Sequence, residues 1–240
     1  MDFRIHWKAM SLRRTHSYQI LLAIAFWLSC AHAIPRNEYG LEVVRSERLY
    51  RELVTRDSSK KLVDLETAIP GIRIDIRYAT SDNFMKRPLY PIARALLRAP
   101  AAEALAAAQR ELSSRDLHLK VFDGYRPYSI TKMMWEPYKD PDFVADPAKG
   151  SRHNRGCAVD VTIIRSDGTE LVMPTAYDDF TPRARHDYAA ADPEAIANRA
   201  MLKEVMERHG FVALPSEWWH YDFRGWERYE LLDIPLDQLP

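Results

Sequence analysis

An aspartate lies in the middle of the most strongly β-forming segment of this sequence. The segment from Cys157 to Ile164 is rich in valine and isoleucine, which predicts a buried strand, and Asp160 is its acidic residue. A carboxylate buried in such a strand must be paired or bound to a metal ion, because its desolvation is otherwise too costly. Any fold of this chain therefore has to bring compensating groups to Asp160, through either a structural ion pair or a metal site.

Two histidines are placed where they could meet this carboxylate. His153 precedes Asp160 by seven residues across Gly156, and a loop entering the strand can fold the imidazole back beside the aspartate. His220 follows Glu217 by three residues further along the chain. Two imidazoles and one carboxylate bind Zn²⁺ and leave a fourth position for water. A single histidine on a strand is more often a hydrogen-bonded core residue, so the metal hypothesis depends on the combination.

Glu217 is a candidate for the proton acceptor that a catalytic zinc site needs. Activation of the water requires a carboxylate that is not itself a ligand. On a regular strand, residues three apart face opposite sides, so Glu217 and His220 would point away from each other. A bulge or a tight bend between them would bring both to one site.

A third polar motif contains an arginine that could stabilise negative charge. In Asp123-Gly124-Tyr125-Arg126-Pro127, the arginine follows the end of an expected strand and is fixed by the proline after it. A guanidinium in this position can point at the oxyanion of a tetrahedral intermediate. The alternative is a salt bridge from Arg126 to Asp123 or Glu136.

Helical and strand patterns are mixed along the chain, without internal repeats or a glycine- and serine-rich linker. Apolar spacing predicts helices over residues 41–54, 101–112 and 193–209, and another beginning at Pro127. Alternation predicts strands over residues 72–78 and 117–122, and the content of valine and isoleucine predicts a strand over 157–164. Residues 211–223 are expected to form a terminal strand or hairpin, and Asp167-Gly168 predicts a hairpin turn. Helices combined with antiparallel-looking strands indicate an α+β fold.

The first 33 residues have the pattern of a secretory signal peptide. Arg13 and Arg14 precede nine consecutive apolar residues, Ile20–Leu28, and Ala31-His32-Ala33 follows as a small-residue cleavage site. The apolar run is too short to span a bilayer, which takes about 20 residues. We expect cleavage near Ala33 and a periplasmic or secreted protein. A buried N-terminal helix and a lipoprotein anchored through Cys30 are the alternatives.

The charge balance argues against nucleic acid as the main partner. The full chain has 34 basic and 34 acidic side chains, so it lacks the basic excess that phosphate binding needs. Cleavage after Ala33 removes four basic side chains and one acidic side chain, which leaves 30 basic and 33 acidic. It also removes Cys30, so Cys157 would be alone and no disulfide could form within the mature chain. We expect no stable membrane insertion after cleavage.

Together, the three polar motifs resemble those of one known family. Ser-x-His-x-x-Gly-x-Ala-x-Asp begins at Ser151, Glu-x-x-His at Glu217 and Asp-Gly-Tyr-Arg-Pro at Asp123. This combination is similar to the VanX-type zinc D-alanyl-D-alanine dipeptidases, which belong with the D,D-carboxypeptidase/Hedgehog-like metallopeptidases. The resemblance extends from Val63 to the C-terminus and includes Tyr78-Ala79-Thr80. We therefore divide the chain into a signal peptide (1–33), an N-terminal lead-in helix (34–62) and a zinc dipeptidase domain (63–240).

The resemblance implies a fold, an activity and a set of site residues. The fold is a single α+β domain with a central antiparallel sheet flanked by helices. The activity is hydrolysis of a small D,D-dipeptide, D-alanyl-D-alanine, to two D-alanines in cell-wall peptide turnover, with one Zn²⁺ per chain. The implied roles are zinc binding by His153, Asp160 and His220, catalysis by Glu217 as base and Arg126 as transition-state stabiliser, and substrate binding by Tyr78, Ser151 and Asp178. Asp178 is expected to meet the free amino group of the substrate, and Asp179 is the alternative.

Two other functions fit the same motifs. A D,D- or L,D-carboxypeptidase or endopeptidase acting on larger peptidoglycan peptides would use the same metal ligands in an open groove. A non-catalytic, zinc-stabilised binding module would keep the ligands but needs no base, so Glu217 argues against it. Cys157 lies inside the metal loop and is a potential soft ligand. Because three ligands and a water complete a catalytic zinc, we expect Cys157 to be a small buried residue instead.

Overall fold

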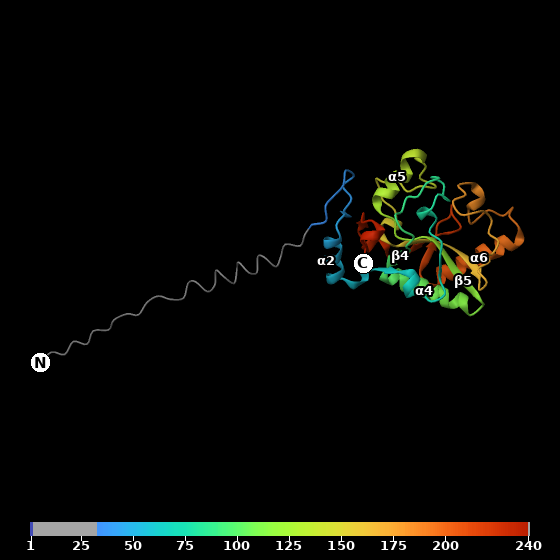
Figure 1. Ribbon diagram of the computed structural model, residues 1–240, viewed down its shortest axis with the longest axis horizontal. Coiled ribbons are helices and arrows are strands. Elements are labelled where there is room, and N and C mark those ends of the chain that lie inside the picture. Colours follow the sequence, from blue (N-terminus) through green and yellow to red (C-terminus); the bar gives the residue numbers. More distant parts are fainter. Residues whose placement is uncertain (2–32, 240) are drawn as a thin grey trace. The chain divides into compact units, whose positions relative to one another are not determined.

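A five-stranded sheet forms the centre of the protein (Figure 1). It contains Asp123, Asp160 and His220, one residue from each polar motif. The computed structural model describes Met1 and residues 33–239. The strands of this sheet follow the order β3-β5-β6-β8-β7. Their bounds are Arg73–Ile74 for β3, Leu117–Asp123 for β5, Ala158–Arg165 for β6, Phe211–Ala213 for β7 and His220–Phe223 for β8.

The two longest strands, β5 and β6, set the position of the site. They pair antiparallel, with Leu117 opposite Arg165 at one end, Asp123 opposite Asp160 at the other, and a register shift just before Asp123. Strands β8 and β7 continue the antiparallel order, whereas the edge strand β3 runs parallel to β5. The expected α+β fold with a central antiparallel sheet is therefore confirmed, apart from one parallel pair at its edge.

Two smaller sheets lie beside the central one. Strand β1 (Val43–Val44) pairs in parallel with β9 (Leu231–Leu232), so the two ends of the described chain are joined. Strand β2 (Leu62–Asp64) pairs antiparallel with β4 (Leu96–Arg98).

Five α-helices surround these sheets in the part of the chain that the structure describes. They are α2 (Glu47–Arg56), α3 (Leu65–Ala68), α4 (Ala99–Ser113), α5 (Tyr128–Tyr138) and α6 (Pro193–Arg208). Helices α4 and α6 pack against each other and against the sheet, and α5 lies apart from them (Figure 1). Short 3₁₀ helices are η1 (Ser58–Lys60), η2 (Arg77–Ala79), η3 (His153–Arg155), η4 (Pro182–Ala184), η5 (Trp226–Arg228) and η6 (Leu236–Gln238).

The ends of the longest helices follow the local signals in the sequence. Pro100 lies in the first turn of α4, where its missing N–H costs nothing. The Asp192 side chain accepts a hydrogen bond from the Glu194 N–H at the start of α6. Gly210, just beyond the end of α6, has a φ of +91°, which glycine adopts without strain.

Two elements differ from the prediction. The helix expected over residues 41–54 is α2, which begins later, because Val43 and Val44 pair with β9 and Ser46 caps the helix. The strand expected over residues 72–78 is reduced to Arg73–Ile74, and its end turns into η2. There, the Tyr78 carbonyl accepts hydrogen bonds from the N–H groups of Leu89 and Tyr90 rather than continuing a ladder.

The predicted signal peptide lies almost entirely outside the part of the chain that the structure describes. Cys30 and the residues just before Ala33 are among the residues outside it. Within the described part, no helix combines the length and apolarity needed to cross a membrane.

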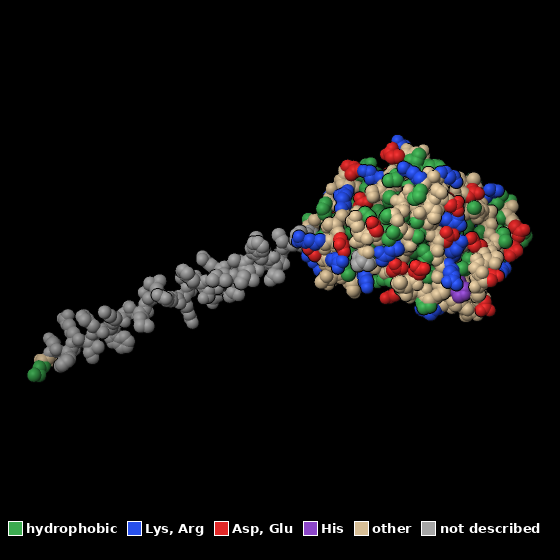
Figure 2. All heavy atoms as spheres, viewed as in Figure 1, with side chains coloured by type: hydrophobic (Ala, Val, Ile, Leu, Met, Phe, Trp, Pro, Cys, Tyr) green, Lys and Arg blue, Asp and Glu red, His purple; other side chains and the backbone are tan. Residues whose placement is uncertain are grey.

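The segment Ile34–Pro240 forms one compact unit. On the face shown in Figure 2, basic and acidic side chains are interspersed, and neither sign dominates a large area.

Candidate active site

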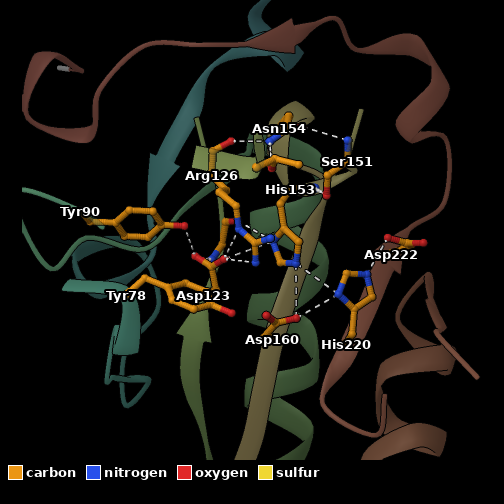
Figure 3. A network of polar contacts seen from close by, with 12 residues as sticks. Tyr78, Tyr90, Asp123, Arg126, Ser151, His153, Asn154, Asp160, His220 and Asp222 are labelled. Atoms are coloured by element: carbon orange, nitrogen blue, oxygen red, sulfur yellow. Dashed lines mark hydrogen bonds and ion pairs between the residues drawn. The ribbon is translucent and has the colours of Figure 1, made fainter. Parts of the chain in front are cut away.

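Three side chains that could hold a metal ion converge at one end of the central sheet. Asp160 in β6 lies directly opposite His220 in β8, and His153 lies in η3, just before β6. All three are buried, and one potential ligand atom from each lies within 4.8 Å of the other two. The structure therefore brings together the three predicted metal ligands, although they come from separate segments of the chain (Figure 3).

The three atoms are spaced as a tetrahedral metal ion requires. His153 Nε2 lies 3.1 Å from His220 Nδ1. Asp160 Oδ1 lies 3.0 Å from His220 Nδ1 and 3.4 Å from His153 Nε2. Ligand atoms bound to zinc at about 2.0–2.1 Å and at tetrahedral angles are about 3.3 Å apart. The donor set therefore fits zinc, and all three residues line one cavity.

Both imidazoles are oriented by a second hydrogen bond. His153 Nδ1–H donates to the Gly124 carbonyl at 2.7 Å, so that the lone pair of Nε2 faces the other two donors. His220 Nε2–H donates to Asp222 Oδ1 at 3.0 Å, which leaves the lone pair of Nδ1 free for a metal. Partners of this kind fix the tautomer of a metal-binding histidine and raise its basicity.

Carboxyl groups outnumber guanidinium groups around this centre. Burial opposes ionisation of Asp160, but the two neighbouring imidazoles hold the pKa of its carboxyl far below the usual range. Burial likewise opposes protonation of His220, yet Asp222 and Asp160 raise the pKa of its imidazole well above the usual value. Five carboxyl groups and two guanidinium groups line the cavity: Asp142, Asp160, Asp178, Glu217, Asp222, Arg126 and Arg152. A cation bound at the three donors would offset this imbalance.

Cys157 lies apart from the three donors. Its side chain is fully buried, and burial raises the pKa of its thiol to about 12. The sulfur donates to the Arg155 carbonyl at 3.6 Å. Cys157 is therefore a small buried residue, as the sequence predicts.

A tight turn brings Glu217 to the same cavity as His220. The His220 N–H donates to the Glu217 carbonyl at 3.3 Å, which closes a turn immediately before β8. The bend needed to place both side chains at one site is therefore present. Glu217 Oε2 lies 4.0 Å from His220 Nδ1. Burial, aided by the negative charges of Asp160 and Asp178, raises the pKa of Glu217 to about 8. This carboxyl group is thus desolvated and lies beside the three donors.

Arg126 forms a salt bridge and also lines the cavity. Its Nε and Nη2 donate to Asp123 Oδ2 at 3.0 and 2.7 Å, so the salt bridge is to Asp123 and not to Glu136. Nη1 takes no part in this pair, and the side chain lines the cavity. Asp123 is itself held by the Tyr90 hydroxyl and the Gly124 N–H. The guanidinium is therefore buried, charged and fixed in direction.

One asparagine ties the arginine loop to the histidine loop. Asn154 Nδ2 donates to the Arg126 carbonyl at 2.9 Å, and Asn154 Oδ1 accepts from the Ser151 N–H at 2.9 Å. The Arg126 N–H donates in turn to the His153 carbonyl at 3.1 Å. Gly124 is required in this arrangement, because a Cβ there would lie 2.8 Å from the Leu96 carbonyl oxygen. The two loops are consequently fixed relative to each other.

The residues predicted to contact substrate also line the cavity. Asp178 accepts a hydrogen bond from the Tyr78 hydroxyl at 3.0 Å through Oδ1, and its buried Oδ2 has no hydrogen-bond partner among the described residues. Asp179 instead pairs with Arg183 at 3.0 Å and does not line this cavity. Ser151 is buried at the cavity wall, where its Oγ accepts from the His153 N–H. Of the two aspartates, Asp178 is therefore the one placed to meet a ligand.

The cavity itself is small and partly aromatic. Its volume is about 120 Å³, and its wall includes Phe84, Phe143, Phe180 and Trp219. Sites for drug-sized ligands are typically about 300 Å³ or larger. The space available therefore favours a small ligand.

The sequence analysis missed two residues that hold the ligands in place. Asp222 orients His220, and the Tyr177 hydroxyl donates to Asp160 Oδ2 at 3.0 Å. Asp222 could have been found, because residues two apart on a strand share a face and a metal-binding histidine usually donates to a carboxylate. Tyr177 gave no comparable signal, because it approaches Asp160 from a loop that follows β6.

Replacing Asp222 with alanine is expected to weaken zinc binding about 10- to 100-fold, because His220 loses the partner that fixes its tautomer. Competition with a chromogenic chelator measures this affinity directly. Asp237→Ala, which removes an exposed carboxylate distant from the three donors in the sequence, is the control and should bind zinc normally. Unchanged affinity in Asp222→Ala would show that the Asp222 contact does not support the metal site.

Comparison with known proteins agrees with the family that the motifs predict. The family model described as D-ala-D-ala dipeptidase, of the M15 peptidases, matches residues 58–231. The D-alanyl-D-alanine dipeptidase of Escherichia coli K12 is 36% identical over 172 residues, which is 72% of this chain and 89% of that protein. The enzyme of the same name from Enterococcus faecium is 33% identical over 181 residues, or 67% of this chain and 90% of that protein. A solved structure of the LdcB LD-carboxypeptidase aligns with a TM-score of 0.43 at 19% identity, covering 81% of this chain and 85% of the other. From the family model and the two dipeptidases, we conclude that this chain belongs to the D-Ala-D-Ala dipeptidase family of M15 peptidases.

Proposed function

We propose that this protein hydrolyses the peptide bond of D-alanyl-D-alanine to give two D-alanines in cell-wall peptide turnover, with one zinc ion held by His153, Asp160 and His220. The observation that carries the proposal is the buried carboxyl of Glu217 beside three converging metal-binding atoms. A structural zinc site has no use for such a group, because all four of its positions are taken by ligands. This argues against a non-catalytic binding module.

Zinc bound at these donors would supply Lewis acidity and lower the pKa of a water at the open position. Glu217 would accept a proton from the attacking water and return it to the leaving amine, so that one carboxyl group serves both halves of the reaction. Arg126 would donate to the carbonyl oxygen of the scissile peptide as negative charge develops there. Because Asp123 already holds this guanidinium in place, little reorganisation is needed in the transition state.

Asp178 and Tyr78 would bind the amino end of the substrate. The unpartnered Oδ2 of Asp178 is a ready acceptor for an ammonium group. Burial, together with the charge of Asp160, raises the pKa of Asp178 to about 7. The carboxylate form becomes more abundant as the pH rises through this value, so KM for the dipeptide should fall across the same range. An ammonium ion next to Asp178 would itself favour the ionised form.

Asp178→Asn is expected to reduce the preference for D-Ala-D-Ala over N-acetyl-D-Ala-D-Ala by about 10- to 100-fold, since a charge-assisted hydrogen bond is worth about 1.5–3 kcal/mol. The ratio of kcat/KM for the two substrates is the measurement. Asp179→Asn is the matched control and should keep the preference of the wild type. Equal effects of the two substitutions would remove Asp178 from substrate recognition.

The main alternative is cleavage of larger wall peptides. Parallel assays of the purified protein with D-Ala-D-Ala and with a wall pentapeptide ending in D-Ala-D-Ala test the choice. Release of D-alanine from the dipeptide alone supports the proposal. Faster cleavage of the pentapeptide would overturn it in favour of a carboxypeptidase. Zinc content of the active protein should approach one ion per chain.

We further propose that the protein works in the periplasm or outside the cell after cleavage near Ala33. Arg13, Arg14 and the apolar run Ile20–Leu28 support this location. Fractionation of cells, followed by N-terminal sequencing of the mature protein, tests it. A mature chain that begins at Cys30 would instead identify a lipoprotein.

A further inference from the structure

A second arginine, Arg152, lines the cavity next to the metal-binding histidines and has no role in the reaction described above. Two guanidinium groups line this cavity, and Arg126 is tied to Asp123 by two hydrogen bonds. Arg152 is bound differently, because its side chain is 45% exposed and lies at the edge of the site. It is therefore the cation that remains available to a ligand.

Two neighbours hold Arg152 in place without using the outer end of its guanidinium. The Arg152 Cζ lies 4.6 Å from the centre of the Trp226 ring, a stacking distance. Its Nε lies 3.5 Å from Oδ2 of Asp222, and Oδ1 of Asp222 accepts a hydrogen bond from His220. The shortest contact of the ion pair is made by Nε, and neither Nη1 nor Nη2 donates a hydrogen bond to a described residue. A planar guanidinium with two such nitrogens matches the geometry of a carboxylate.

Asp178 and Arg152 are held by residues on opposite sides of the three donors. Figure 3 shows Tyr78 on one side and Asp222 on the other. The Tyr78 hydroxyl contacts Asp178, and Asp222 pairs with Arg152. A dipeptide is a zwitterion whose two residues span at most about 7 Å. With its scissile carbonyl at the centre, its ammonium would face Asp178, and its carboxylate would lie on the side of Arg152.

We propose that Arg152 binds the free α-carboxylate of the substrate and thereby selects dipeptides with an unblocked C-terminus. The inference rests on the proposed dipeptidase function and adds a specificity-determining residue to it. Arg126 does not fill this role, because its side chain is buried and its guanidinium already donates two hydrogen bonds to the Asp123 carboxylate. Trp226 acts as a positioning residue that keeps Arg152 stacked.

The test compares D-Ala-D-Ala with its C-terminal amide, D-alanyl-D-alaninamide, in which the carboxylate is neutralised but the scissile bond is retained. The wild type should prefer the free acid. Arg152→Ala is expected to lower kcat/KM for the free acid about 10- to 100-fold, mainly through KM, and to leave the value for the amide nearly unchanged. The preference for the acid should then largely disappear, and Arg152→Lys should restore part of it.

Arg155→Ala provides a matched control. Arg155 lies 5.3 Å from the same Trp226 ring but does not line the cavity, so its loss should leave the acid-to-amide ratio unchanged. Zinc content and melting temperature of each variant show whether the site is intact. If Arg152→Ala lowers hydrolysis of acid and amide equally, Arg152 acts only through Asp222 and the proposal is wrong. If the wild type does not cleave D-Ala-D-Ala at all, the dipeptidase function itself fails, which is a distinguishable result.

Discussion

Glu217→Gln is expected to lower kcat about 10²- to 10⁴-fold while the protein keeps its zinc. Glutamine has nearly the same shape as glutamate but cannot accept the proton of the attacking water. The metal ligands His153, Asp160 and His220 are untouched, so metal content measured by atomic emission should stay at the level of the wild type. Glu227→Gln, at an exposed position nearby in the sequence, is the control and should retain full activity.

Glu217→Gln, which is expected to lower kcat, is also expected to increase the free energy of unfolding of the metal-free protein. The folded-state pKa of Glu217, about 8, lies above its ordinary value of 4.5, so the native state binds the proton more tightly than the unfolded state does. Protonated Glu217 therefore contributes fully to the free energy of unfolding at acid pH, and this contribution is lost as the pH rises from about 4.5 through about 8. Glutamine is neutral throughout, so the metal-free variant should melt above the wild type, and the difference should grow over this range. Near-normal turnover, or a difference in melting temperature that is independent of pH, would contradict the assigned role and environment of Glu217.

Arg126→Ala should lower kcat about 100- to 1000-fold, which corresponds to about 3–4 kcal/mol of transition-state stabilisation. The fall should appear in kcat more than in KM, because the charge that Arg126 stabilises develops only during the reaction. Steady-state kinetics with D-Ala-D-Ala measures both constants. A change confined to KM would make Arg126 a binding residue rather than a stabiliser of the transition state.

The arginine substitution also leaves a buried carboxylate without its main partner. Asp123 is fully buried and would keep only the Tyr90 hydroxyl and the Gly124 N–H as donors. Arg126→Lys retains a positive charge and therefore separates the two effects. It should fold more stably than Arg126→Ala but recover little kcat, because lysine cannot reproduce the fork that reaches both Asp123 and the substrate.

Much of the site could be predicted because several of its residues are close together in the sequence. His153 and Asp160 are joined by a short loop, and Asp123 and Arg126 lie within four residues of one another, so chain geometry alone limits how far apart these side chains can be. The pairing of Asp160 with His220 is different, because it depends on β6 and β8 becoming neighbours across 60 residues. No spacing rule contains that information, and the resemblance to a family supplied it.

Elements that depend on distant partners were predicted least well. The helix expected from residue 41 loses its beginning to a strand, because Val43 and Val44 find β9 at the other end of the chain. The strand expected to end at Tyr78 stops early, because the Tyr78 carbonyl is used by a loop that follows. In both cases hydrogen bonds to residues outside the predicted element overrode the local pattern.

The hydrogen bonds of Asn154 have a consequence for how the metal is acquired. They join the loop of Arg126 to the loop of His153 through protein groups alone, and His153 is aimed by the Gly124 carbonyl in the same way. The geometry of these two loops thus does not depend on an ion to create it. Removal and return of zinc should therefore leave the arrangement of these two loops unchanged. Activity should return on addition of zinc without a slow refolding phase.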